Sequence, residues 1–97
     1  ADTWTTGPPL PTTRSGGASV VYKGLIVVAG GECNQERTFV QTEGFDVTTG
    51  RWVTLAPMPT GKHGITAATD GEVVYIQGGS PICGLAYTDT LMTFRLP

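Results

Sequence analysis

The chain has few of the residues from which catalytic and metal sites are built. Its 97 residues include one histidine and two cysteines. A zinc or copper site with several histidine ligands therefore cannot come from a single chain. The sequence also has no serine, histidine and acid arrangement with a recognisable local signature. We expect a protein that is not an enzyme and that has no cofactor and no metal.

Charge of one sign and long apolar runs are also scarce. Six basic residues stand against eight acidic residues, for a formal net charge of −2 at pH 7. This balance argues against a broad basic face that binds phosphates, so we expect no nucleic acid partner. No run approaches the roughly 18 apolar residues of a membrane span, so we expect no membrane partner. A soluble protein, secreted or cytoplasmic, fits both observations.

Glycine is plentiful, and two glycine pairs divide the chain into repeats. Gly30-Gly31 follows the apolar run 25–29, and Gly78-Gly79 follows the apolar run 73–77. The spacing between the second glycines of the two pairs is in the range of propeller blades. An apolar run that ends at a glycine pair predicts a buried strand that enters a tight turn. The chain is therefore predicted to hold two β-sheet repeats.

Other landmarks repeat at the same spacing, and together they resemble the kelch repeat. Kelch units carry a Gly-Gly pair after the second strand, an aromatic residue near the end of the third strand and a tryptophan that opens the fourth. The first unit matches this pattern with Gly30-Gly31, Phe45 and Trp52. The second unit keeps Gly78-Gly79 and Phe94. It differs in having Met92 where the first unit has Glu43, and no tryptophan follows Phe94.

The resemblance implies an all-β fold, a β-propeller of four-stranded blades with two blades in this chain. Residues 14–56 would form the first blade, and residues 62–97 a second blade that lacks its fourth strand. Residues 1–6 would form the outer strand of a neighbouring blade. Trp4 precedes Trp52 by the same interval that separates the glycine pairs, and it would pack inward from that strand.

The spacing across the two chain ends predicts strand exchange between copies. Trp52 follows Phe45 by seven residues, and joining the last residue to the first would place Trp4 seven residues after Phe94. Two blades span only part of a ring, so residues 1–6 can complete a blade only in another copy. Kelch propellers are most often six-bladed, so we expect a homotrimer that closes one ring. Four or eight blades stay open as alternatives.

The function expected from this assembly is that of a non-catalytic, self-assembling scaffold or binding module. In kelch adaptors, basic side chains at the positions of Arg14 and Lys62 lie at a channel mouth where acidic peptides dock. The resemblance therefore implies a peptide or another anionic ligand there. The alternative is that each basic side chain packs structurally against a neighbouring blade, with Glu43 as a partner. The same face would carry His63, Glu32, Asn34, Gln35 and Ser80.

Two further alternatives stay open at this point. The chain is either a natural two-blade unit or a piece of a longer kelch propeller with a secreted enzyme or carbohydrate-binding role. Cys33 and Cys83 fall in equivalent loops, and their spacing matches no metal motif. An oxidising compartment would allow a disulfide. Because equivalent loops of adjacent blades can lie beyond bridging distance, two free thiols are the simpler expectation.

Overall fold

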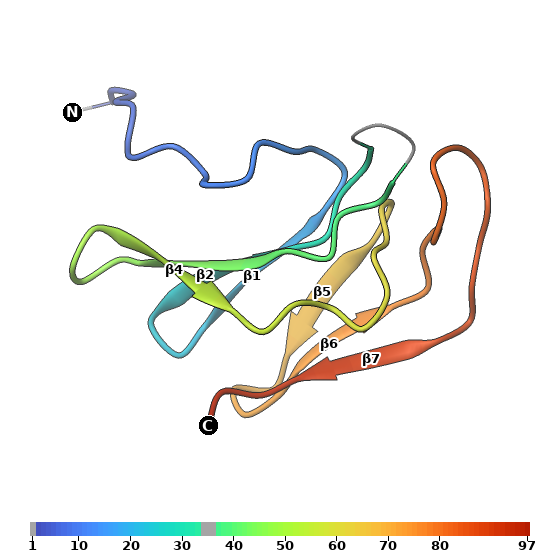
Figure 1. The fold of residues 1–97 in the computed structure, drawn as a ribbon. Coiled ribbons are helices and arrows are strands. Elements are labelled where there is room, and N and C mark those ends of the chain that lie inside the picture. The colour runs from blue at the N-terminus through green and yellow to red at the C-terminus, as the bar shows by residue number, and fades with distance from the viewer. Residues whose placement is uncertain (1, 34–36) are drawn as a thin grey trace.

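Two antiparallel sheets make up the regular structure of the chain (Figure 1). The computed structural model describes residues 2–33 and 37–97. The first sheet has the order β1-β2-β3-β4, and its strands are Ala18–Tyr22, Leu25–Ala29, Thr42–Asp46 and Arg51–Leu55. The second sheet has the order β5-β6-β7, and its strands are Thr66–Thr69, Val74–Gln77 and Leu91–Phe94. The all-β class is confirmed. Among the described residues no helix is long and apolar enough to span a membrane.

The residues of the first turn in each sheet explain why its first two strands form a hairpin. In the first sheet Lys23 and Gly24 join β1 to β2 and both have positive φ, 48° and 79°. That combination fits the twist of a two-residue hairpin. In the second sheet the Asp70 carboxylate accepts hydrogen bonds from the backbone N–H groups of Val73 and Glu72, each at 2.9 Å. These bonds stabilise the ionised form and lower the pKa of Asp70.

The glycine pairs bring the end of one sheet against the chain that enters the next. The backbone N–H of Gly31 donates to the Lys62 carbonyl at 2.8 Å. A Cβ added to Gly30 would lie 2.6 Å from that same carbonyl oxygen. Only glycine allows so close an approach at a φ of 69°. The repeat signal in the sequence therefore marks a point of contact between the two sheets.

One face of each sheet packs on the other to form the core. The buried side chains come from both sheets and from the connection between them, and they are Ala18, Tyr22, Val27, Ala29, Met58, Ile65, Val74 and Ile76. Tyr22 links the sheets most directly. Its hydroxyl donates to the Glu72 carbonyl at 2.7 Å and accepts from the Leu96 N–H at 3.3 Å. Its ring also meets the ring of Phe94 edge to face, at 6.1 Å between centroids.

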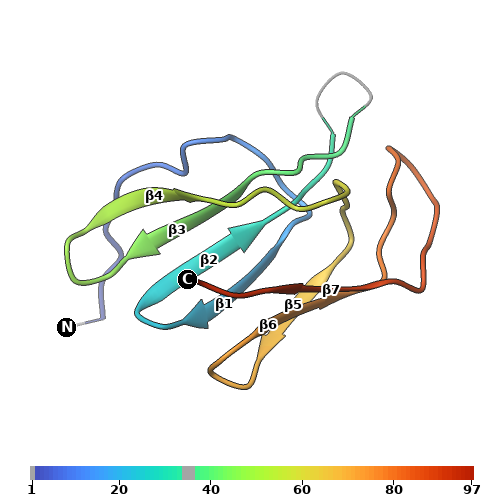
Figure 2. The same cartoon turned by 60° about the horizontal axis from the view of Figure 1, so that its bottom comes forward.

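Residues 2–6 form no strand in the single chain, and their expected pairing with another copy stays a prediction. The side chain of Trp4 is 99% exposed, whereas Trp52 is half-buried. In Figure 2 the segment before β1 runs beside the first sheet, away from β7. In the single chain this segment pairs with none of the sheet edges that the described residues leave open at β1, β4, β5 and β7.

Removal of the Tyr22 hydroxyl tests how much the contact between the sheets contributes to stability. Tyr22→Phe should lower the free energy of unfolding by about 1–2 kcal/mol, because two backbone groups in part-buried hydrogen bonds lose their partner. Tyr75→Phe is the matched control, since the Tyr75 hydroxyl makes only an exposed 3.3 Å contact with Asp70. Urea denaturation of both variants measures the difference. Equal losses would show that Tyr22 has no special role.

Candidate functional site

The side chain of Arg14 is buried inside the protein. Its side chain is only 1% exposed, and its Nη1 lies 3.2 Å from Oε1 of the buried Glu43. Its Nη2 donates to the Val28 carbonyl at 3.0 Å. Burial lowers the pKa of Arg14, and the Glu43 carboxylate opposes that change. Glu43 is thus the partner of Arg14, as the structural alternative expects, but it lies in the same repeat and not in a neighbouring blade.

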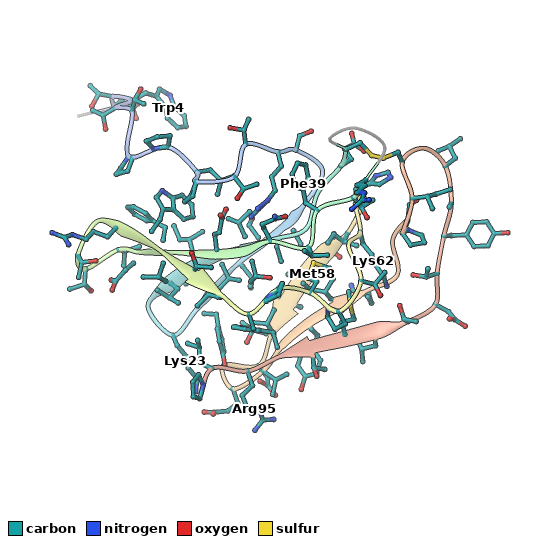
Figure 3. The ribbon with its side chains drawn as sticks, in the orientation of Figure 1. Trp4, Lys23, Phe39, Met58, Lys62 and Arg95 are labelled. Carbon is teal, nitrogen blue, oxygen red and sulfur yellow. A yellow bond between two sulfur atoms is a disulfide. The ribbon has the colours of Figure 1, made fainter. Side chains whose placement is uncertain are left out.

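Lys62, at the same position in the second repeat, is also buried, with 2% of its surface exposed. Its Nζ donates to the hydroxyls of Thr88, at 3.1 Å, and Thr90. Figure 3 shows Lys62 between the chain entering β5 and the segment that leads to β7. The pairing register explains the different partner. Val28 faces Glu43 in the first sheet, and its counterpart Ile76 faces Met92 in the second, so the second sheet offers no carboxylate at that place.

The structure buries both Arg14 and Lys62, and the anion-binding mouth at these residues stays a prediction. Each long cationic side chain reaches back into its own sheet and satisfies acceptors there. A buried cation with such partners cannot extend into solvent without leaving them unpaired.

The cysteines form a disulfide, the alternative that the sequence left open, so the expectation of free thiols is wrong. Cys33 and Cys83 are bonded, with their Cα atoms 5.8 Å apart. They come within reach because the two loops leave neighbouring sheets on the same side, directly after the glycine pairs. The Thr38 hydroxyl adds a second link between the loops, donating to the Pro81 carbonyl at 3.2 Å.

His63 lies beside the disulfide and ties the same two loops together. Its Nδ1 is 2.8 Å from Oε2 of Glu32, and its Nε2 is 2.9 Å from the Ile82 carbonyl and 3.1 Å from the Gly84 carbonyl. Both ring nitrogens face oxygen atoms, and these contacts fix the orientation of the ring between the two loops. The described residues contain no cluster of three potential metal ligands.

Ser80 completes this arrangement. It is buried, its hydroxyl donates to the Ile82 carbonyl at 2.8 Å, and its backbone pairs with that of His63. We use the name loop brace for five residues: Glu32, Cys33, His63, Ser80 and Cys83. The predicted site residues Asn34 and Gln35 lie outside the described residues. The loop brace thus joins three of the predicted site residues, but as structural partners of one another.

Sequence reasoning missed the exposed apolar side chains of the second loop. Leu85 is fully exposed, Tyr87 is 92% exposed, and Ile82 is also exposed. An open hollow beside them is lined by Ser15, Glu32, Cys33, His63, Cys83, Gly84 and Leu85. The available signal was the run from Ile82 to Tyr87, which has large apolar residues in a loop that should be polar. The arrangement places exposed apolar side chains beside two loops that a disulfide joins.

Blade-like sheets joined by glycine pairs define the chain as a β-repeat protein. The family model of the kelch motif matches residues 13–59. The chain is also 33% identical, over 78 residues, to the Kelch-like protein terF of Aspergillus terreus. This alignment covers 78% of the chain and 17% of the relative, so the chain spans about a sixth of that protein's length. The chain belongs to the kelch-repeat family.

The disulfide should contribute strongly to stability. The cysteines are separated by 50 residues, and closing a loop of this length in the unfolded chain corresponds to about 4 kcal/mol. Cys33→Ser combined with Cys83→Ser should lower the free energy of unfolding by that order. Denaturation with and without a thiol reductant measures it. Reductant should destabilise the parent and leave the double variant unchanged; a parent that is insensitive to complete reduction would contradict the prediction.

The Arg14–Glu43 pair should behave as one buried unit. Arg14→Met alone should cost about 3–5 kcal/mol, because Glu43 would keep a buried charge without its partner. Adding Glu43→Met should recover much of this loss, since a pair of apolar side chains needs no counter-charge. A double-mutant cycle from urea denaturation gives the coupling. Additive losses would show that the two charges do not depend on each other.

Proposed function

We propose that this chain is a non-catalytic, self-assembling kelch module, and that three copies close one six-bladed ring. Kelch repeats generally serve as protein-binding or scaffold elements, which supports a role without chemistry. The observation that carries the proposal is that the first sheet has an apolar face with no sheet packed on it. The contact inside the chain indicates what should cover that face.

The open face belongs to a row of paired residues in the first sheet. Val21 pairs with Ile26, Ile26 with Phe45 and Phe45 with Trp52. Val21 is 71% exposed and Ile26 is also exposed. Val74 holds the repeat position of Ile26 in the second sheet, and it is buried in the core between the sheets. The second sheet thus buries this row against the first sheet, whereas the first sheet leaves the equivalent row exposed.

Such a contact is heterologous, because the face that each sheet offers differs from the face that it meets. Contacts of this type continue until the rotation between units closes a ring. The second sheet of one copy would then pack on the open face of the first sheet of the next. Three copies give six blades, a common number for kelch propellers, and leave no lateral face uncovered.

The loop brace gives this scaffold a surface on which a partner can dock. The covalent bond and the His63 contacts hold the second loop in one conformation, which reduces the entropy cost of binding. Leu85 and Tyr87 extend from that loop into solvent. Large apolar anchors of this kind bind apolar pockets on proteins or peptides. We therefore propose a protein or peptide as the partner at this face.

A second candidate is that the two sheets are part of a longer kelch propeller. The length of the Aspergillus terreus relative favours it, since the aligned part is 17% of that protein. The disulfide fits a protein folded in an oxidising compartment, as a secreted propeller with an enzyme or carbohydrate-binding role would be. Other blades of the same polypeptide would then cover the open faces.

The mass in solution separates the two candidates. The 97 residues have a mass of 10.2 kDa, so light scattering coupled to size exclusion should give about three times that value. Leu85→Ser combined with Tyr87→Ser is the control, because the loop surface serves a partner and should leave the mass unchanged. A tetramer mass would keep self-assembly and remove the six-bladed ring. A monomer mass at high concentration would contradict self-assembly and leave the second candidate.

A further inference from the structure

The Cys33–Cys83 bond lies at the surface, outside the packed core. Cys33 is exposed and Cys83 is half-buried. Both cysteines line the open hollow beside Leu85, and its volume of about 520 Å³ gives a small dithiol room to reach the bond from solvent. Figure 3 shows the bond in yellow, at the loops beyond the ends of the strands. Exposed disulfides are typical of labile or regulatory bonds.

The contacts that hold the two sheets together do not include this bond. The core between the sheets is built from apolar side chains such as Val27 and Val74. Beside the core, the backbone N–H of Gly31 donates to the Lys62 carbonyl at 2.8 Å. Tyr22 links the sheets at the end that is remote from the loops. Both sheets should therefore stay folded and packed when the bond is reduced in the absence of denaturant.

Each loop is also attached to its own sheet by hydrogen bonds that reduction does not break. In the second loop the Ser80 hydroxyl lies 2.8 Å from the Ile82 carbonyl and 3.3 Å from the Gly84 carbonyl. In the first loop the backbone N–H of Phe39 donates to the Gly31 carbonyl at 2.9 Å. Reduction therefore separates two loops that each stay attached to a sheet.

Noncovalent contacts span the same gap and keep the cysteines close when the bond is open. The Thr38 hydroxyl donates to the Pro81 carbonyl at 3.2 Å, and Nδ1 of His63 lies 2.8 Å from Oε2 of Glu32. Contacts of this kind are weak compared with a covalent bond, so the reduced loops should part and meet again repeatedly. The thiols should meet often enough for the bond to form again.

We propose that the Cys33–Cys83 bond is a reversible redox site, whose reduction by a dithiol separates the two loops while both sheets stay folded. One thiol of the reductant loses its proton and attacks Sγ of Cys33. The S–S bond breaks, a mixed disulfide forms, and Cys83 leaves as a thiolate that takes up a proton. The second thiol of the reductant then displaces Cys33, which also takes up a proton. The dithiol is oxidised to a disulfide by two electrons, and the protein disulfide is reduced by the same two electrons.

Reduction of the bond divides the hollow beside it. The side chains that line the hollow come from both repeats, with Ser15 and Glu32 in the first and His63 and Leu85 in the second. A partner that contacts both sides binds the reduced protein more weakly, because binding must then order the two loops against each other. This consequence for docking rests on the proposed function, whereas the redox site itself does not.

The kinetics of reduction in native buffer test the site directly. The parent protein is treated with dithiothreitol, free thiols are trapped by alkylation, and mass spectrometry gives the reduced fraction. The rate should rise in proportion to the dithiothreitol concentration and exceed the rate of global unfolding by at least about tenfold, because an exposed bond reacts without unfolding. A rate that levels off at the unfolding rate of the oxidised protein would overturn the proposal, since only the unfolded chain would then react.

Backbone amide chemical shifts locate the change. In the reduced protein the shifts of Glu32, Phe39 and Ile82 should change, and those of Val27 and Val74 in the core should not. The double variant Cys33→Ser with Cys83→Ser is the control, and it should give the spectrum of the reduced protein with or without dithiothreitol. Shifts that change throughout both sheets, or a spectrum of an unfolded chain, would overturn the proposal.

Re-formation of the bond tests the noncovalent contacts between the loops. After removal of dithiothreitol, oxidised glutathione should restore the bond in the parent. Thr38→Val should slow this step by about threefold to tenfold, because one hydrogen bond that holds the loops together is lost. Thr48→Val is the matched control, since Thr48 is exposed in the turn after β3. Equal rates for the two variants would contradict the role of Thr38.

The mass in solution distinguishes failure of this proposal from failure of the proposed function. Light scattering should give the same mass for the oxidised and the reduced protein, because the bond joins loops of one chain. A different mass after reduction would show that the effect reaches beyond the loops, and would overturn the proposal. A monomer mass in both states would contradict self-assembly and support a redox site confined to one chain.

Discussion

The packing of one sheet face on the next is the contact on which the rest of the structure depends. A kelch sheet is too thin to bury its apolar residues alone, since each strand presents alternate side chains to both faces. In this chain one face of the first sheet packs on the second sheet. There the Tyr22 hydroxyl bonds to the backbone of Glu72, just before β6, and of Leu96, just after β7. The opposite face, with Val21 and Ile26, remains exposed. Each sheet face that packs on a neighbouring sheet therefore adds to the stability of the fold.

The two buried cations show how the repeats diverged around this contact. Arg14 is neutralised by Glu43 within the first sheet. Lys62 has hydroxyl partners, because Met92 faces Ile76 where Glu43 faces Val28. Both side chains connect the start of a repeat to its third strand or to the segment before it. The basic residue at this position thus has a structural role in each repeat. The exposed side chains of this chain that could contact a partner lie in the loops joined by the loop brace.

Much of the fold could be predicted from the sequence, because its signals are local. Alternation, the glycine pairs and the turn at Asp70 and Gly71 depend on backbone geometry within a few residues, and the structure places strands and turns there. The site could not be predicted in the same way. Whether Arg14 points to solvent or to Glu43 depends on a contact across the sheet, and the Cys33–Cys83 bond depends on how far apart two loops of different sheets lie. The spacing of residues in the sequence reveals neither the contact across the sheet nor the distance between the loops.

The central claim is that copies of this chain assemble and cover the open face of the first sheet, where Val21 and Ile26 are exposed. Light scattering of the parent and of Val21→Asp tests it most directly. The account predicts a mass of three chains for the parent and a much lower mass for the variant, because an unpaired charge is costly to bury against a neighbouring sheet. Equal masses for the two proteins would contradict the account.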